Sequence, residues 1–127
     1  MAYNILLVDD SSIIRKMLTK TLGLSGVPVK AVFEAENGQQ ALEVLDKTWI
    51  DVIFLDINMP VMNGIEFMHA LRDHPEFIAT PVIVISTEGS RVRKAELADM
   101  DVKAYLRKPV SPEQIADAVQ TVLNVGR

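Results

Sequence analysis

Three aspartates stand directly after apolar runs of the sequence. Asp9 and Asp10 follow the run Ile5–Val8, and Asp56 follows the run Ile50–Leu55. An ionised carboxylate can attack an electrophile, bind a divalent cation or cap a helix. Carboxylates that crowd together repel one another, and a shared proton or a divalent cation relieves that repulsion. The positions of these aspartates therefore matter as much as their type.

Two more polar residues occupy similar positions later in the chain. Ser86 follows the run Val82–Ile85, and Lys108-Pro109 follow the weaker run Val102–Leu106. Ligands of open parallel sheets bind beyond the carboxyl ends of the strands, so we expect three carboxylates, a hydroxyl and an ammonium on one rim. The chain has no cysteine and only two histidines, which favours oxygen ligands and a hard cation such as Mg²⁺.

Such a rim could support phosphoryl transfer. An ionised Asp56 would attack phosphorus, Lys108 and the metal would neutralise charge on the phosphoryl oxygens, and Ser86 would donate a hydrogen bond. The product would be an aspartyl phosphate.

Each residue also has a simpler interpretation. Asp9 and Asp10 could cap a helix, Asp56 could open a turn-rich loop, Ser86 could end a strand, and Lys108 could be an ordinary solvated lysine. These interpretations do not explain why all five residues occur at successive strand ends.

The elements that would position these residues can be read from hydrophobic periodicity. Three short continuous runs, named above, are typical of central parallel strands, whereas Val29–Phe33 and Val102–Leu106 mix polar and apolar residues and suggest strands nearer the edges. Helical patterns occupy Ser12–Leu24, Gln39–Lys47, Gly64–Arg72, roughly Ser90–Asp99, and Pro112–Val125. Ser111-Pro112-Glu113-Gln114 resembles a capping box. Alternating strands and helices predict a doubly wound α/β fold.

Composition excludes several classes of protein. A chain of 127 residues with 49% hydrophobic content suits a single domain over residues 1–127. No run approaches the roughly 18 apolar residues of a membrane span, and no leader is visible, so we expect a cytoplasmic protein without membrane insertion. The net charge of −4 argues against direct binding of nucleic acid.

Four motifs together resemble those of a known family. They are Asp9-Asp10, Leu55-Asp56-Ile57-Asn58-Met59-Pro60-Val61-Met62-Asn63-Gly64, Ser86-Thr87-Glu88 and Tyr105-Leu106-Arg107-Lys108-Pro109. Across essentially the whole chain, the sequence is similar to response-regulator receivers of the chemotaxis CheY type. The resemblance implies a flavodoxin-like five-stranded parallel sheet of order 2-1-3-4-5 with five helices, and a phosphoacceptor role in two-component signalling.

The resemblance also implies roles for the rim residues. Asp56 would be the phosphoacceptor. Asp10, Asp56 and the backbone carbonyl of Asn58 would bind Mg²⁺ directly, with Asp9 assisting through water. Lys108 would contact the phosphoryl group.

A second set of roles concerns switching and signal lifetime. By resemblance, Ser86 and Tyr105 form the conformational switch, and Asn58 and Glu88 tune dephosphorylation, with a short-lived phosphorylated state as the hypothesis. The bond between Lys108 and Pro109 would be cis.

The implied partners are a histidine kinase as phosphodonor and a downstream target protein. The target would bind a face built from the fourth helix, fifth strand and fifth helix, which carries Arg91, Arg93, Lys94, Lys103 and Tyr105. That face could equally be ordinary solvated charge. We expect a monomer or a weak phosphorylation-dependent dimer. Whether the protein counts as an enzyme stays open, because such a domain catalyses its own phosphorylation and dephosphorylation but acts mainly as a switch.

Other functional classes compete with the receiver. A Mg²⁺-dependent phosphohydrolase could use the same aspartyl nucleophile, although Asn58 stands where such enzymes have a second aspartate. A flavodoxin-like electron carrier would need a phosphate-binding loop where Asp9-Asp10 stand. A phosphate-independent interaction domain is a further alternative. The sequence identifies neither kinase nor target, and it leaves open a stand-alone chemotaxis protein, a phosphorelay member or the receiver of a larger regulator.

Overall fold

The structure is a computed structural model that describes residues 2–57, 59–77, 79–86 and 102–124. Its strands are β1 (Tyr3–Val8), β2 (Val29–Ala35), β3 (Val52–Leu55), β4 (Val82–Ser86) and β5 (Ala104–Arg107). Its helices are α1 (Ser12–Ser25), α2 (Gly38–Lys47), α3 (Gly64–Arg72) and α5 (Pro112–Asn124). The predicted elements agree with these bounds to within two residues at either end, and the helix predicted near residues 90–99 lies outside the described residues.

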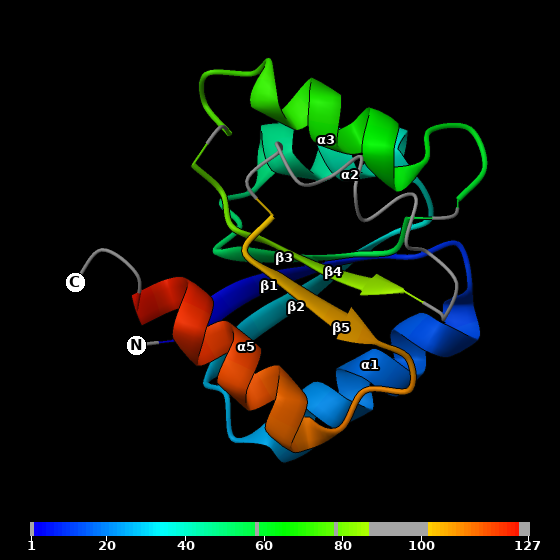
Figure 1. Cartoon of the computed structure of the whole chain (residues 1–127). Coiled ribbons are helices and arrows are strands. Elements are labelled where there is room, and N and C mark those ends of the chain that lie inside the picture. The colour runs from blue at the N-terminus through cyan, green and yellow to red at the C-terminus, as the bar shows by residue number, and fades with distance from the viewer. Residues whose placement is uncertain (1, 58, 78, 87–101, 125–127) are drawn as a thin grey trace.

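The five strands form one parallel sheet of order β2-β1-β3-β4-β5 (Figure 1). This order confirms the doubly wound fold. Every residue of β3 is buried, which explains its uninterrupted apolar sequence, because helices cover a parallel sheet on both faces. The strands β2 and β5 lie at the edges and are only partly buried, as their mixed sequences predict.

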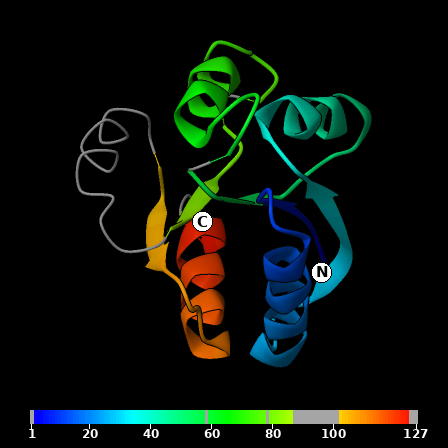
Figure 2. The same ribbon diagram turned by 90° about the vertical axis from the view of Figure 1, so that its right-hand side faces the viewer.

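Two helical layers cover the sheet. The helices α1 and α5 lie side by side on one face, and α2 and α3 lie on the other (Figures 1 and 2). Successive side chains of a strand point to opposite faces, so each strand contributes to both cores. Leu6, Val8, Ile53 and Leu55 belong to the core under α2 and α3, and Ile5, Leu7, Val52 and Phe54 to the core under α1 and α5.

Local hydrogen bonds fix where the helices begin. Ser11 caps α1 by accepting the N–H of Ile14, at 3.2 Å. Ser111 and Gln114 exchange side-chain-to-backbone hydrogen bonds at the start of α5, as the predicted capping box requires. The described helices include none that is long and apolar enough to cross a membrane.

The strand register brings the ends of β1 and β3 together. Val8 pairs with Leu55 of β3 and with Ala35 of β2. The backbone N–H of Asp56 donates to the carbonyl of Val8 at 2.9 Å, so the residues that follow both strands meet at the carboxyl edge of the sheet.

Candidate functional site

Three carboxylates converge at this edge. Oxygens of Asp9, Asp10 and Asp56 all lie within 4.8 Å of one another. Asp9 and Asp56 are buried, whereas Asp10 is exposed. Such a cluster would repel itself if all three groups were ionised, so it favours a bound cation or a retained proton.

The loop between β1 and α1 holds Asp9 in a defined orientation. Its Oδ1 accepts the backbone N–H of Ser11 at 2.9 Å. The residue that caps α1 is Ser11, so helix capping does not account for Asp9 and Asp10, which precede the cap. The side chains of both aspartates lie close to that of Asp56 at the carboxyl edge of the sheet.

Lys108 extends from the end of β5 into the carboxylate cluster. Its Nζ lies 2.8 Å from Oδ2 of Asp9 and 3.6 Å from Oδ1 of Asp56. Its backbone N–H donates to the carbonyl of Ser86 at 2.9 Å, which ties the ends of β4 and β5 together. The Lys108–Pro109 bond is cis, as the resemblance implies.

Burial dominates the electrostatics of Asp56. It raises the pKa of this carboxyl from 3.8 to about 6. The positive charge of Lys108 opposes the rise, the negative charges of Asp9 and Asp10 add to it, and the backbone N–H of Ile57 lowers the pKa slightly. A cation among the three carboxylates would favour the ionised, nucleophilic form of Asp56.

The chemistry of these donors fits a hard divalent cation. The cluster offers only carboxylate oxygens, and Mg²⁺ is usually held by one or two carboxylates together with waters and phosphate oxygens. Asp10 and Asp56 would be the direct ligands, with Asp9 beside them. Asn58, whose carbonyl the resemblance adds to this set, lies outside the described residues.

Gly64 supports the site in a way that the sequence interpretation missed. Its N–H donates to the carbonyl of Ile57 at 2.8 Å, and a Cβ at this position would lie 2.7 Å from the backbone oxygen of Asp56. Asn63 and Glu66 form a capping box that starts α3 at this point. The sequence predicts a helix that begins at Gly64 but does not reveal that the lack of a side chain there lets α3 begin against the backbone of Asp56.

Arg15 is a second residue that sequence reasoning overlooked. It is buried in α1, and its Nη1 donates to the backbone carbonyl of Asp9 at 2.6 Å. Its Nε is 2.8 Å from Oε1 of Glu34 in β2. The signal available in the sequence was a basic residue six positions after Asp9, near the start of the predicted helix.

The predicted switch residues lie on neighbouring strands. Ser86 ends β4, and Tyr105 pairs with Val84 in β5. Tyr105 packs against the core under α2 and α3, and partial burial raises the pKa of its phenol. Glu88 lies outside the described residues, as do Arg91, Arg93 and Lys94 of the predicted output face, whereas Lys103 is described and exposed.

Comparison with known proteins decides the family. Residues 5–120 match the response regulator receiver domain. The chain belongs to this family.

Individual relatives of this receiver agree. It is 35% identical over 123 residues to the chemotaxis protein CheY1 of Helicobacter pylori, covering 96% of this chain and 98% of that one. It is 34% identical over 119 residues to the transcriptional regulatory protein CpxR of Escherichia coli, covering 94% of this chain but 48% of that protein. The structure of the chemotaxis response regulator CheY4 of Vibrio cholerae superposes with a TM-score of 0.83 at 37% identity, covering 97% of this chain and all of that one.

The comparisons support a phosphoacceptor receiver of two-component signalling over the hydrolase alternative.

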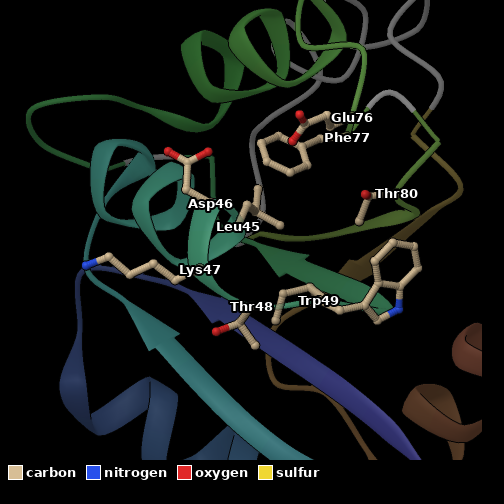
Figure 3. A pocket seen from close by; sticks show the side chains of 9 residues that line it. Leu45, Asp46, Lys47, Thr48, Trp49, Glu76, Phe77 and Thr80 are labelled. Carbon is tan, nitrogen blue, oxygen red and sulfur yellow. The ribbon is translucent and has the colours of Figure 1, made fainter.

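A cavity of about 500 Å³ lies away from Asp56, at the amino ends of β3 and β4. Figure 3 shows Trp49 and Thr80 lining it. The cavity beside Lys108 is smaller, about 250 Å³, and is lined mainly by apolar residues of α1 and by Pro109 and Val110.

Proposed function

We propose that this receiver accepts a phosphoryl group from a histidine kinase on Asp56, in a reaction that requires Mg²⁺. The observation that carries the proposal is the position of Asp56 itself. It is a buried carboxylate at the carboxyl end of the central strand β3, and it faces one ammonium and two further carboxylates. Receivers of the CheY type interact with histidine kinases and downstream targets.

The transfer step follows from this geometry. An oxygen of Asp56 forms a bond to phosphorus while the bond from phosphorus to the imidazole nitrogen of the donor breaks, and the leaving imidazole keeps that electron pair and takes up a proton. Lys108 would neutralise charge on the phosphoryl oxygens, and Asp10 and Asp56 would hold the metal. Mg²⁺, when bound, supplies the remaining positive charge.

Signal output would pass through Ser86 and Tyr105. Phosphorylation adds negative charge and acceptor oxygens at the carboxyl edge of the sheet, and Ser86 ends the strand next to β3. We propose that Ser86 responds to the phosphoryl group and that Tyr105 changes its rotamer with it. The face formed by the fourth helix, β5 and α5 would then bind a target protein, and any dimer would be weak and dependent on phosphorylation.

The pathway proposal draws on the relatives. CheY1 of Helicobacter pylori matches over 98% of its length, so we propose a cytoplasmic role similar to that of chemotaxis regulators. Asn58 and Glu88 would give the phosphorylated form a short lifetime. A phosphoryl half-life of hours, measured after removal of the donor, would contradict this.

The proposed function can be tested by intact mass after incubation with acetyl phosphate and Mg²⁺. The comparison includes Asp56→Asn, a chelator control and Asp46→Asn, which removes an exposed aspartate of α2. One labile phosphoryl group is expected on the wild type and on Asp46→Asn, and none on Asp56→Asn or in the chelated sample. No adduct on the wild type, together with no binding of beryllofluoride, would favour a phosphate-independent interaction domain.

A further inference from the structure

Arg15 is a buried charge that the phosphoryl chemistry does not use. Among the described residues, the buried charged side chains are Asp9, Arg15 and Asp56, and two of these belong to the site. A cation removed from water is unfavourable unless close partners compensate for its lost hydration. The partners of Arg15 therefore indicate which part of the structure the buried guanidinium holds in place.

Those partners contact different nitrogens of the guanidinium. Nη1 donates to the backbone carbonyl of Asp9 at 2.6 Å, and Nε contacts Oε1 of Glu34 at 2.8 Å. The Arg15 side chain is 10% exposed, whereas that of Glu34 is 49% exposed. The buried guanidinium thus connects the half-exposed carboxylate of Glu34 with the backbone of Asp9. Charge-assisted hydrogen bonds of this length are among the stronger ones in proteins.

Asp9 is consequently fixed at several points. Arg15 holds its carbonyl, its backbone N–H donates to Ala35, and its side chain contacts Ser11 and Lys108. Asp10 follows directly in the chain, so the orientation of Asp9 also constrains where the next carboxylate can lie. Mutation of groups that orient metal ligands from outside typically lowers metal affinity by roughly 10–100-fold.

We propose that Arg15, held by Glu34, is a positioning residue for the divalent-cation site, and that Glu34 also offsets a guanidinium charge that would repel the cation. The inference rests on the Mg²⁺ site proposed above. It has two separable parts. Arg15 orients the backbone of Asp9 through its carbonyl, and the carboxylate of Glu34 neutralises the charge of the Arg15 guanidinium.

The geometric part is tested by removing both charges together. Arg15→Met/Glu34→Gln keeps the net charge of the pair at zero but removes the donor to Asp9. We expect its Mg²⁺ dissociation constant, measured by isothermal titration calorimetry, to rise about tenfold. The matched control is Lys16→Met/Glu43→Gln, which removes one charge of each sign from exposed positions on α1 and α2 and is expected to bind Mg²⁺ as the wild type does.

The electrostatic part is tested by Glu34→Gln alone. Glutamine keeps an acceptor for Nε but leaves the guanidinium charge without its counter-charge. We expect Mg²⁺ to bind about threefold more weakly at low ionic strength, and the deficit to shrink at about 1 M KCl, where the Debye length is roughly 3 Å. A purely structural contact would lose affinity equally at both salt concentrations.

The outcomes separate this inference from the proposed function. If the wild type binds no Mg²⁺, the metal site itself is wrong. If the wild type binds Mg²⁺, and both Arg15→Met/Glu34→Gln and Glu34→Gln bind it as tightly as the wild type does, only the positioning role is overturned. This holds even if the melting temperatures of the metal-free variants fall. Should the double variant fail to fold by circular dichroism, Glu34→Gln decides the matter, and wild-type affinity at low salt would then overturn the inference.

Discussion

Burial and charge act in opposite directions on Asp56. Removal from water raises its pKa, Lys108 lowers it, and the neighbouring aspartates raise it further, with a result of about 6. The nucleophilic form is the ionised one, so the metal-free site is poised close to losing its nucleophile in mildly acidic solution. A divalent cation would shift the balance towards the carboxylate.

The raised pKa predicts that Asp56 destabilises the metal-free protein at neutral pH. Its folded pKa of about 6 lies above the ordinary value of 3.8, so the folded state binds the proton more tightly than the unfolded state. The resulting loss of stability is absent below about pH 4, develops as pH rises through about 6, and is complete above it. We expect Asp56→Asn to be more stable than the wild type at pH 7.5 in chelator, by on the order of 2–3 kcal/mol.

Urea unfolding at several pH values measures this difference. The advantage of Asp56→Asn should shrink as pH falls towards 4, and saturating Mg²⁺ should reduce it at pH 7.5 by stabilising the wild type. An advantage that did not change with pH would mean that burial of the charge is not its cause.

The ammonium of Lys108 lies beside the carboxylates of Asp9 and Asp56. Its removal should therefore change Mg²⁺ affinity and the rate of phosphorylation in opposite directions. We expect Lys108→Met to bind Mg²⁺ several-fold more tightly, because a competing positive charge is lost. We expect it to react with acetyl phosphate on the order of 10²-fold more slowly, because charge on the phosphoryl oxygens is less well neutralised. Calorimetry and the rate of adduct formation by mass measure the two effects, and weaker Mg²⁺ binding would contradict the assignment.

Sequence and structure agree on part of the site. Asp9, Asp56 and Lys108 were expected to meet because parallel strands end at one edge, and their side chains do meet. Gly64 and Arg15 were missed for a physical reason. Their contributions depend on a close backbone approach and on a contact between α1 and the end of β1, and neither leaves a periodic pattern in the sequence.

At the level of elements, the start of α3 is closely coupled to the end of β3. Gly64 opens α3, and any Cβ there would lie 2.7 Å from both the backbone oxygen of Asp56 and Cα of Ile57. Backbone cannot move aside as a flexible side chain would. The helix therefore fixes the main chain that carries the phosphoacceptor.

This coupling predicts opposite effects for two glycine substitutions. Gly64→Ala should lower the free energy of unfolding by about 2 kcal/mol, because the added methyl group forces the backbone apart. Gly23→Ala in α1, where a Cβ meets nothing within 4 Å, should raise it by about 0.5–1 kcal/mol through better helix propensity. Urea denaturation of both variants measures the contrast, and equal effects would show that the close approach at Gly64 is unimportant.

Two of the small errors in predicted strand bounds share a cause. Ile50 was assigned to the third strand and Val102 to the fifth, yet β3 begins at Val52 and β5 at Ala104. Both residues are apolar because they pack into the core under α2 and α3 before their strands begin. An apolar residue indicates burial. Whether it also belongs to a strand depends on pairing with a neighbouring strand, which hydrophobicity does not reveal.

At the scale of the whole molecule, the two ends of the sheet differ in character. The carboxyl ends carry the charged cluster, and the amino ends carry the cavity beside Trp49, whose side chain is 76% exposed (Figure 3). The strand order itself was expected only through family resemblance. Periodicity identifies strands but does not say on which side of the sheet each crossover places the next one.

The separation of these ends predicts that Trp49 is insensitive to the site. Its indole Nε1 contacts Oδ1 of Asp51 at 3.0 Å, at the start of β3 and not at its end. We expect the emission of Trp49 to stay unchanged on titration with Mg²⁺ and then with beryllofluoride, while calorimetry of the same samples shows binding. A change in emission that followed the binding isotherm would show that the signal travels the length of the strand.

The ion pair between Lys108 and Asp9 joins residues 99 positions apart in the chain. During synthesis on the ribosome, the three aspartates emerge well before the lysine that balances them. A nascent chain that has reached β4 therefore already carries its acidic residues, yet it lacks the lysine whose ammonium lies beside the carboxylates of Asp9 and Asp56. Competence to accept a phosphoryl group should consequently appear late, once β5 has left the exit tunnel, so that unfinished chains stay silent in signalling.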